Sequence, residues 1–323
     1  MNAGPEMPRL ERIAGGIEGA LVGDALGVPV EFSGRDARDA DPVAEMRAGG
    51  TWGQPAGTWS DDGALLLCAV EGLTKDYSPE YLGQLFVRWM KDRHWTARDE
   101  VFDIGGATLT ALGRIDAGVA IAAAGVTGED ENGNGSLMRI LPVALRFAPR
   151  VPDAELTRRA MEVSRITHAH PRSQLACAFY CLTAAALLRQ RTPEEAYAHA
   201  REAIQPCLGK FPSERSAFDR ILSGKISRLA RSDIKSSGYV IDTLEAALWC
   251  LLRHASFQGA VLAAVNLGGD TDTTGCITGG LAGVAHGRAA IPRIWLETLP
   301  RREELNDLVA AFVREAAPSD NGR

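Results

Sequence analysis

Residues 266–275, NLGGDTDTTG, place two aspartates, Asp270 and Asp272, among hydroxyl-bearing and small side chains. The apolar run AVLAAV precedes this stretch, and the Gly/Ala-rich run CITGGLAGVAHG follows it. Apolar neighbours at helical spacing on both sides predict that the stretch is buried between two helices. Buried carboxylates require a compensating charge or hydrogen-bond donors, so this stretch is the first candidate for a functional site.

Helical patterning extends outward from this stretch over most of the chain. Ala-rich segments with apolar residues at spacings of three and four recur, whereas strand-like alternation is nearly absent. We therefore expect an all-α fold, a single-domain many-helix bundle. The expected helices are 10–27, 62–74, 79–91, 104–113, 174–190, 193–204, 241–255, 258–266 and 273–286. Glycines cluster in the expected loops and helix boundaries, where they cap helices or allow the backbone to approach a ligand closely.

One domain, residues 9–315, is expected from the length of 323 residues and the 46% hydrophobic content. Residues 206–238 are more polar and are interpreted as a surface excursion, because the apolar helices on either side look like parts of one core. Residues 1–8 and 316–323 are expected to be flexible ends.

Composition excludes several classes of function. The 35 Lys and Arg residues against 41 Asp and Glu residues give a net charge of −6, so nucleic acid is not an expected ligand. The N-terminus lacks the basic-then-apolar order of a secretory signal, and no apolar run is expected to reach membrane-spanning length, so we expect a cytoplasmic protein. The six cysteines are scattered through apolar helical pattern and are interpreted as buried thiols.

A second acidic cluster, Ser60, Asp61 and Asp62 in GTWSDDG, directly precedes an apolar helix. Taken alone, it is explained by helix capping and by the helix dipole. Together with Asp270 and Asp272 it supplies oxygen ligands that favour Mg²⁺, Mn²⁺ or Ca²⁺ over zinc or copper. If the clusters converge, two divalent cations about 3.5–4 Å apart would neutralise the charge and activate water.

The chain resembles the ADP-ribosylglycohydrolase family in seven motifs that occur in the family's order. They are GDALGVPVEF (23–32), GTWSDD (57–62), DIGGAT (103–108), GNGSLMRILPVAL (133–145), ITHAHP (166–171), SGYVIDT (237–243) and VNLGGDTDTTG (265–275). The resemblance implies an all-α hydrolase with two Mg²⁺ or Mn²⁺ ions. Such an enzyme cleaves the glycosidic bond between ADP-ribose and a protein side chain, arginine above all, or a small acceptor.

The resemblance also implies which residues bind the cations. One ion would be bound by Ser60, Asp61, Asp62 and Asp272, and the other by Asp270, Asp272 and Thr273. Two positions depart from the family pattern, which most often has Thr in place of Ser60 and often has Thr in place of Gly63. A hydroxyl oxygen is kept at Ser60, so that exchange is mild.

Substrate contacts follow from the same resemblance. Glu31 would gate the site and contact the distal ribose, and Asp24 would hold the neighbouring loop through backbone N–H groups. The phosphates would bind at Gly133, Asn134, Gly135 and Ser136, the ribose at His168 and the adenine at Tyr239, and Met138 would be a further substrate contact. Asp103 is a candidate catalytic carboxylate, although an N-cap would also explain it. Glu31, Asp61 and Asp103 all stay candidates for proton transfer.

Two alternatives remain open at this stage. A relative that keeps the pocket without turnover would bind ADP-ribose, or would block a toxin or regulatory partner by contact. A metal-dependent phosphoesterase would use the same paired aspartates, but it would release AMP or phosphate in place of free ADP-ribose. The expected partner is an ADP-ribosylated protein or a small ADP-ribose conjugate.

Overall fold

The protein is helical throughout the part that the computed structural model describes, residues 7–75 and 77–316. Within these ranges the extended backbone forms three isolated β-bridges and no strand. The predicted all-α fold is therefore confirmed. Residues 1–6 and 317–323, which make up most of the predicted flexible ends, lie outside the described residues.

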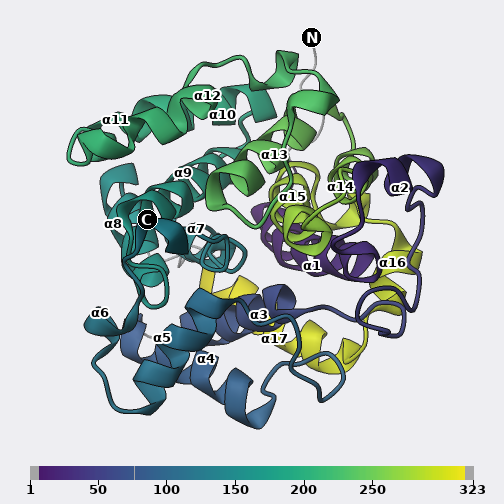
Figure 1. Cartoon of the computed structure of the whole chain (residues 1–323), viewed down its shortest axis with the longest axis horizontal. Coiled ribbons are helices and arrows are strands. Elements are labelled where there is room, and N and C mark those ends of the chain that lie inside the picture. Colours follow the sequence, from purple (N-terminus) through teal and green to yellow (C-terminus); the bar gives the residue numbers. More distant parts are fainter. Residues whose placement is uncertain (1–6, 76, 317–323) are drawn as a thin grey trace.

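Most helices follow one another with short connections, but residues 41–60 and 93–105 form longer loops (Figure 1). The α-helices are α1 (Arg9–Gly27), α2 (Arg35–Ala40), α3 (Asp61–Leu73), α4 (Pro79–Asp92), α5 (Gly106–Asp116), α6 (Ile121–Ala124), α7 (Leu141–Phe147), α8 (Asp153–Arg165), α9 (Pro171–Leu188), α10 (Pro193–Ala203), α11 (Gln205–Leu208), α12 (Asp219–Leu222), α13 (Val240–Arg253), α14 (Phe257–Val265), α15 (Thr271–His286), α16 (Arg293–Thr298) and α17 (Arg302–Ala316). The 3₁₀ helices are η1 (Val28–Val30), η2 (Glu129–Glu131), η3 (Pro212–Phe218), η4 (Ile226–Arg228), η5 (Arg231–Asp233) and η6 (Arg288–Ala290).

Side-chain caps fix the start of several helices at the positions where the sequence has Ser or Thr. Ser78 and Ser256 accept hydrogen bonds from backbone N–H groups in the first turns of α4 and α14. Thr192 forms a capping box with Glu195 at the start of α10. Each cap satisfies N–H groups that a helix leaves unpaired at its N-terminus.

Every expected helix is present, with boundaries that differ by a few residues. The longest helices outside the expected segments are α8 and α17. In α8 the buried side chains Leu156, Ala160 and Val163 recur at spacings of four and three. This narrow apolar stripe lies among charged residues, which is why the segment does not stand out by composition.

The helices α1 and α15 lie side by side in the middle of the fold (Figure 1). They approach so closely that glycines of one helix contact the backbone of the other. A Cβ atom added to Gly15 or to Gly19 would lie 2.5 Å from the carbonyl oxygen of Gly283 or Gly279, respectively. Side chains cannot be accommodated at this separation, so the glycine positions set the distance between the two helices.

This arrangement gives the helical glycines a role that the sequence did not predict. The glycine clusters were assigned to helix boundaries and loops, whereas Gly15, Gly19, Gly23, Gly275 and Gly279 lie inside the two expected helices and contact the partner helix. Their spacing of four places each set on one helix face, and that spacing was the available signal.

The expectation that no apolar run reaches membrane-spanning length is wrong for the segment that contains α1. Residues 9–30 are long and apolar enough by length and composition, with a mean hydropathy of 1.3 over the most apolar window. That window is entirely buried inside the protein, as in the core helix of a bundle. The cysteines fit the same core, since all six are free and only Cys207 is more than slightly exposed.

Replacing Gly19 with Ala should destabilise the protein, because the added methyl group would lie 2.5 Å from the Gly279 carbonyl oxygen and 2.9 Å from the Phe257 ring. The expected loss is about 1–3 kcal/mol in the free energy of unfolding, measured by urea denaturation. Gly113→Ala is the matched control, since its added methyl group meets nothing within 4 Å and should raise stability by up to about 1 kcal/mol. Equal effects of the two variants would contradict the close helix contact.

Candidate active site

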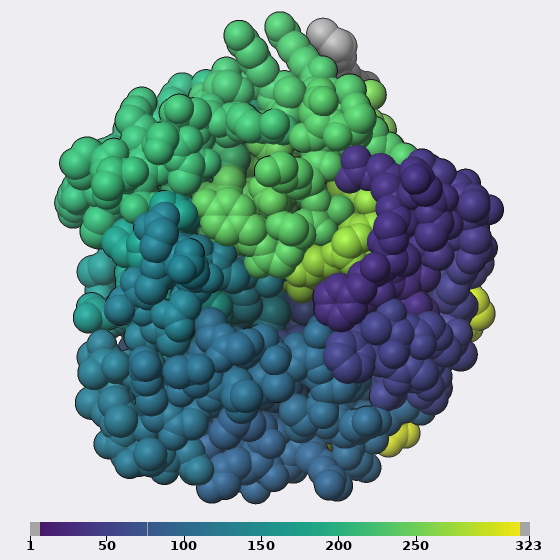
Figure 2. Space-filling model, in the orientation of Figure 1, coloured from purple at the N-terminus to yellow at the C-terminus, as the bar shows by residue number. Residues whose placement is uncertain are grey.

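Acidic residues from five separate segments surround one cavity of about 540 Å³. Figure 2 shows a hollow where purple, blue, green and yellow-green segments of the chain meet. The cavity is lined by Glu31, Phe32, Asp61, Asp103, Gly105, Gly106, Ala107, Thr108, Thr110, Asp130, Glu131, Gly133, Asn134, Gly135, Met138, His168, Gly238, Asp270 and Thr273. Asp62 and Asp272 are buried and are not part of this lining.

The two acidic clusters converge, as the sequence analysis expected. Ser60 caps α3, and its hydroxyl donates to Oδ2 of Asp62 at 3.2 Å. The Thr273 hydroxyl from the first turn of α15 donates to the same Asp62 oxygen at 3.2 Å. Asp62 therefore joins the start of α3 to the start of α15.

A second group of carboxylates includes Asp272, in the first turn of α15. One carboxylate oxygen from each of Glu31, Asp103 and Asp272 lies within 4.8 Å of the other two. Three like charges at this separation repel one another strongly unless protons or cations compensate them. The arrangement is therefore suited to binding positive charge.

Several of the buried oxygens have no hydrogen-bond partner within the described part of the chain. They are Oδ1 of Asp62, Oδ1 of Asp270 and Oδ2 of Asp272. Unpaired buried carboxylate oxygens are costly, and hard divalent cations are bound by oxygens of this kind. This donor set fits the binding of metal ions by the predicted residues.

Burial and mutual repulsion raise the pKa values of these carboxyl groups. Burial is the largest cause for Asp61, Asp62 and Asp272, and the neighbouring acidic groups raise their pKa values further. Burial and then Asp103 raise the pKa of Glu31 to about 9, and burial raises the pKa of Asp103 to about 6. In the absence of a compensating cation the cluster thus retains protons near neutral pH.

Asp24 holds the loop before α3, which confirms its predicted structural role. Its carboxylate accepts hydrogen bonds from the backbone N–H of Ser60 at 3.0 Å and of Gly63 at 2.7 Å. A Cβ atom at Gly63 would lie 2.8 Å from the Trp59 side chain and 2.9 Å from Oδ2 of Asp24. Packing against Trp59 therefore explains why this chain has glycine at position 63, where the family often has Thr.

The segment 133–138 borders the cavity but does not lead directly into a helix, since α7 begins at Leu141. Gly133, Asn134, Gly135 and Met138 line the cavity, and the Asn134 amide donates to Oδ2 of Asp270 at 2.8 Å. This contact ties the segment to the acidic cluster.

Ser136 faces away from the cavity. Its hydroxyl lies 2.9 Å from the Ser164 hydroxyl and 3.4 Å from the Cys177 sulfur, and the residue is fully buried. The Ser136 hydroxyl therefore bonds within the core, and the prediction that Ser136 contacts the substrate stays a prediction. Tyr239 is likewise absent from the cavity lining, although it forms an isolated β-bridge with Gly133.

His168 lines the cavity as a neutral group, because burial, followed by the charge of Arg139, lowers its pKa to about 3. Its Nδ1 atom lies 2.8 Å from the Thr167 hydroxyl, which leaves Nε2 as the ring nitrogen that could contact a ligand in the cavity. A neutral imidazole in this position suits hydrogen bonding to a sugar hydroxyl.

The N-terminus of α5 is a cavity element that the sequence analysis did not identify. Asp103 was offered as its N-cap, but the N-cap is Gly105, which provides no side-chain hydrogen bond. Gly105, Gly106 and Thr108 line the cavity, and the buried Thr108 hydroxyl has no partner in the described residues. Free N–H groups at a helix N-terminus attract anions, and the glycine doublet in DIGGAT was the available signal.

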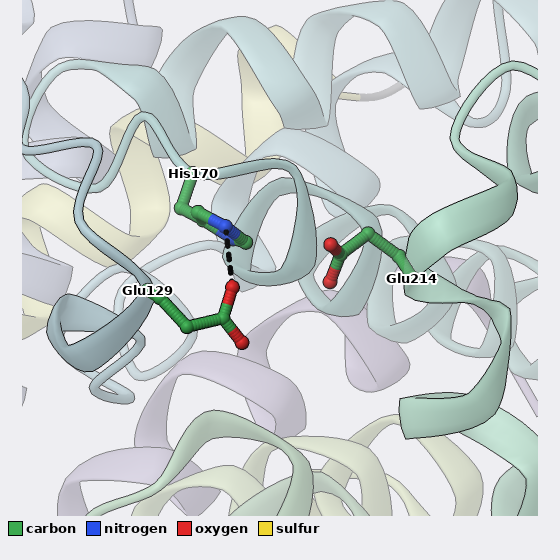
Figure 3. Close-up of side chains that lie close together, drawn as sticks. All are labelled: Glu129, His170 and Glu214. Atoms are coloured by element: carbon green, nitrogen blue, oxygen red, sulfur yellow. Dashed lines mark ion pairs between the residues drawn. The ribbon is translucent and has the colours of Figure 1, made fainter.

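A second cluster of possible metal ligands consists of Glu129, His170 and Glu214, and Figure 3 shows the ion pair between His170 and Glu129. Arg172 pairs with Glu129 at 2.7 Å and with Glu214 at 2.8 Å. Nδ1 of His170 accepts a hydrogen bond from the Arg172 backbone N–H at 3.2 Å, which caps α9. We interpret this cluster as a structural network that joins η2, α9 and η3.

Comparisons with known proteins define the class of protein to which this fold and site belong. The model of the ADP-ribosylglycohydrolase family matches residues 5–321, so the chain belongs to this family. It is 30% identical to an ADP-ribosylarginine hydrolase Tri1 of Pseudomonas putida (strain GB-1), over 96% of this chain and 80% of that protein. It is 29% identical to the ADP-ribosyl-[dinitrogen reductase] glycohydrolase of Rhodospirillum rubrum, over 91% and 92% of the two chains.

A solved structure described as an ADP-ribosylglycohydrolase-related protein complex has the same fold. Its TM-score is 0.80 at 33% identity, and the match covers 96% of this chain and 99% of that one. The resemblance stated from the seven motifs is confirmed.

The raised pKa values predict how stability depends on pH. A carboxyl group whose pKa is higher in the folded protein stabilises the fold below its unfolded pKa, about 4, and this contribution is lost as the pH rises through its folded pKa. The relevant folded pKa values are about 6 for Asp103, about 7 for Asp24 and about 9 for Glu31. The melting temperature of the cation-free protein should therefore decrease as the pH is raised from about 5 to about 9.

Millimolar Mg²⁺ should raise the melting temperature by several degrees near pH 9 and by much less near pH 5, because protonated carboxyl groups bind cations weakly. Differential scanning calorimetry with and without EDTA measures both effects. A Mg²⁺-induced gain that is the same at the two pH values would contradict this account.

Proposed function

We propose that the chain is a divalent-cation-dependent hydrolase that releases ADP-ribose from modified arginine side chains of proteins. The observation that carries the proposal is the convergence of Asp62, Asp272 and Thr273 beside a cavity lined by Glu31 and Asp103. The family membership and the arginine hydrolases among the relatives support the same reaction and the same acceptor.

Two ions, Mg²⁺ or Mn²⁺, are proposed as the cofactor. One is assigned to Ser60, Asp61, Asp62 and Asp272, and the other to Asp270, Asp272 and Thr273. Cations there supply positive charge that compensates the buried carboxylates, and they lower the pKa of water that they bind. The unpaired oxygens of Asp62, Asp270 and Asp272 support this assignment.

The remaining residues bind and orient the substrate. The N-terminus of α5 and the backbone of Gly133 and Gly135 provide N–H groups for the diphosphate, whereas the Asn134 N–H donates to the Gly238 carbonyl. His168 provides a ring nitrogen for a ribose hydroxyl. These groups direct the glycosidic carbon toward the acidic side of the cavity, which Asp61 and Asp103 line.

The reaction consumes one water molecule. Its oxygen bonds to the anomeric carbon, the bond from that carbon to the guanidino nitrogen breaks, and a proton moves to the departing nitrogen. Positive charge develops on the sugar in an oxocarbenium-like transition state, and nearby carboxylates stabilise it. Glu31, Asp61 and Asp103 line the cavity and are the candidates for moving the proton.

Replacing either Asp61 or Asp272 with Asn should reduce the release of ADP-ribose by at least about a thousandfold, because each change removes an anionic ligand oxygen. Chromatography of the products from an arginine-ADP-ribosylated protein, with Mg²⁺ or with EDTA, measures this loss. Asp36→Asn, on exposed α2, is the matched control and should retain full activity.

Retained activity in both Asp61→Asn and Asp272→Asn would contradict the cation assignment. AMP or phosphate as the product would indicate a phosphoesterase. Binding of ADP-ribose without release by the unmodified protein would indicate a binding protein, for which a toxin or regulatory protein is the candidate partner. The proposed location is the cytoplasm, where an ADP-ribosylated protein would be the substrate.

A further inference from the structure

The large apolar side chain with the greatest exposure among the described residues is Phe32, at 64%. The other exposed examples are Ile294 at 59%, Leu109 at 49%, Leu10 at 47% and Val119 at 39%. Only Phe32 of this group lines the acidic cavity. An exposed aromatic ring at the edge of a cavity is available to a ligand.

The backbone of Phe32 is held in an unfavourable conformation that keeps the ring there. Its φ angle is 61°, in the left-handed region that bulky residues rarely adopt. The Phe32 N–H donates to the Gly269 carbonyl at 2.7 Å, and the Gly269 N–H donates to the Ser33 carbonyl at 2.8 Å. This reciprocal pair fixes the residue to the loop before α15, and strain of this kind persists where the surroundings impose it.

Two further aromatic rings, which are not part of the cavity lining, continue from Phe32. The ring centroids of Phe32 and Trp52 lie 6.4 Å apart, and those of Trp52 and Phe102 lie 5.5 Å apart. The Trp52 indole N–H donates to the Glu31 carboxylate, and Phe102 directly precedes Asp103. We call Phe32, Trp52 and Phe102 the aromatic rim.

The aromatic rim adjoins Glu31 and Asp103, whereas Asn134 contacts the cluster through Asp270. If the segment 133–135 binds the ADP part of the substrate, the group beyond the glycosidic bond lies toward the rim. An aromatic face and two carboxylates both attract positive charge. A planar guanidinium can stack on the ring and donate to carboxylates at the same time. A glycosidic oxygen carries neither a hydrogen nor a charge, so an O-linked acceptor gains neither interaction through its linking atom.

We propose that Phe32, at the exposed end of the aromatic rim, stacks on the guanidinium of the acceptor and so favours substrates in which ADP-ribose is linked to arginine. This inference rests on the proposed function and assigns the acceptor side of the same cavity. Phe32 is then a specificity-determining residue, and Trp52 positions Glu31 beside it.

The test uses the full chain with Mg²⁺ and compares Phe32→Leu, which removes the ring, with Phe32→Tyr, which keeps it. Two quantities are measured for each variant, kcat/KM for an ADP-ribosylarginine peptide and Kd for free ADP-ribose. Phe32→Leu should lower kcat/KM roughly tenfold, the size expected for one cation–π contact. Phe32→Tyr should keep kcat/KM, and Kd should be unchanged in both variants.

Ile294→Ala is the matched control, because it alters a similarly exposed apolar side chain on α16 away from the cavity and should leave both quantities unchanged. Unchanged kcat/KM in Phe32→Leu would overturn the proposal. An equal loss of kcat/KM and of ADP-ribose affinity would also overturn it, because Phe32 would then contact the ADP-ribose part. If the unmodified protein releases no ADP-ribose from the arginine peptide, the proposed function and this inference both fail.

Discussion

The backbone contact between α1 and α15 determines where the acidic groups of the cavity lie. A Cβ atom at Gly27, the last residue of α1, would overlap the backbone of Asp272. The Thr271 hydroxyl donates to the Gly27 carbonyl at 2.8 Å at the same point. The chain segment that leaves α1 toward Glu31 is thereby held against the first turn of α15. Glu31 and Asp272, 241 residues apart in sequence, therefore share one site.

Apolar packing around these two helices and α9 explains why the interior tolerates so much negative charge. The unfavourable burial of the carboxylates is opposed by the packing of many apolar side chains around α1, α9 and α15. Asp24 is compensated by backbone N–H groups, but single oxygens of Asp62, Asp270 and Asp272 are not. The fold therefore maintains a site whose charge is only balanced when protons or cations are bound.

The sequence allowed the helical fold and most of the acidic site to be predicted, for two different physical reasons. Periodic apolar residues identify each helix separately. The order of the motifs indicates a family resemblance, and that resemblance predicts that Asp61, Asp62, Asp270 and Asp272 share one site. Contacts set by the packing of distant segments gave no such signal. The orientation of Ser136 toward Ser164 and the hydrogen bond from Trp52 to Glu31 both depend on tertiary structure alone.

The central claim is that the start of α3 and the start of α15 form one cation site. Anomalous diffraction from crystals grown with Mn²⁺ tests this claim most directly. The account predicts manganese peaks within bonding distance of the Asp62 and Asp272 carboxylates and the Thr273 hydroxyl. Manganese bound only at the cluster of Glu129, His170 and Glu214, or at no carboxylate in the cavity, would contradict it.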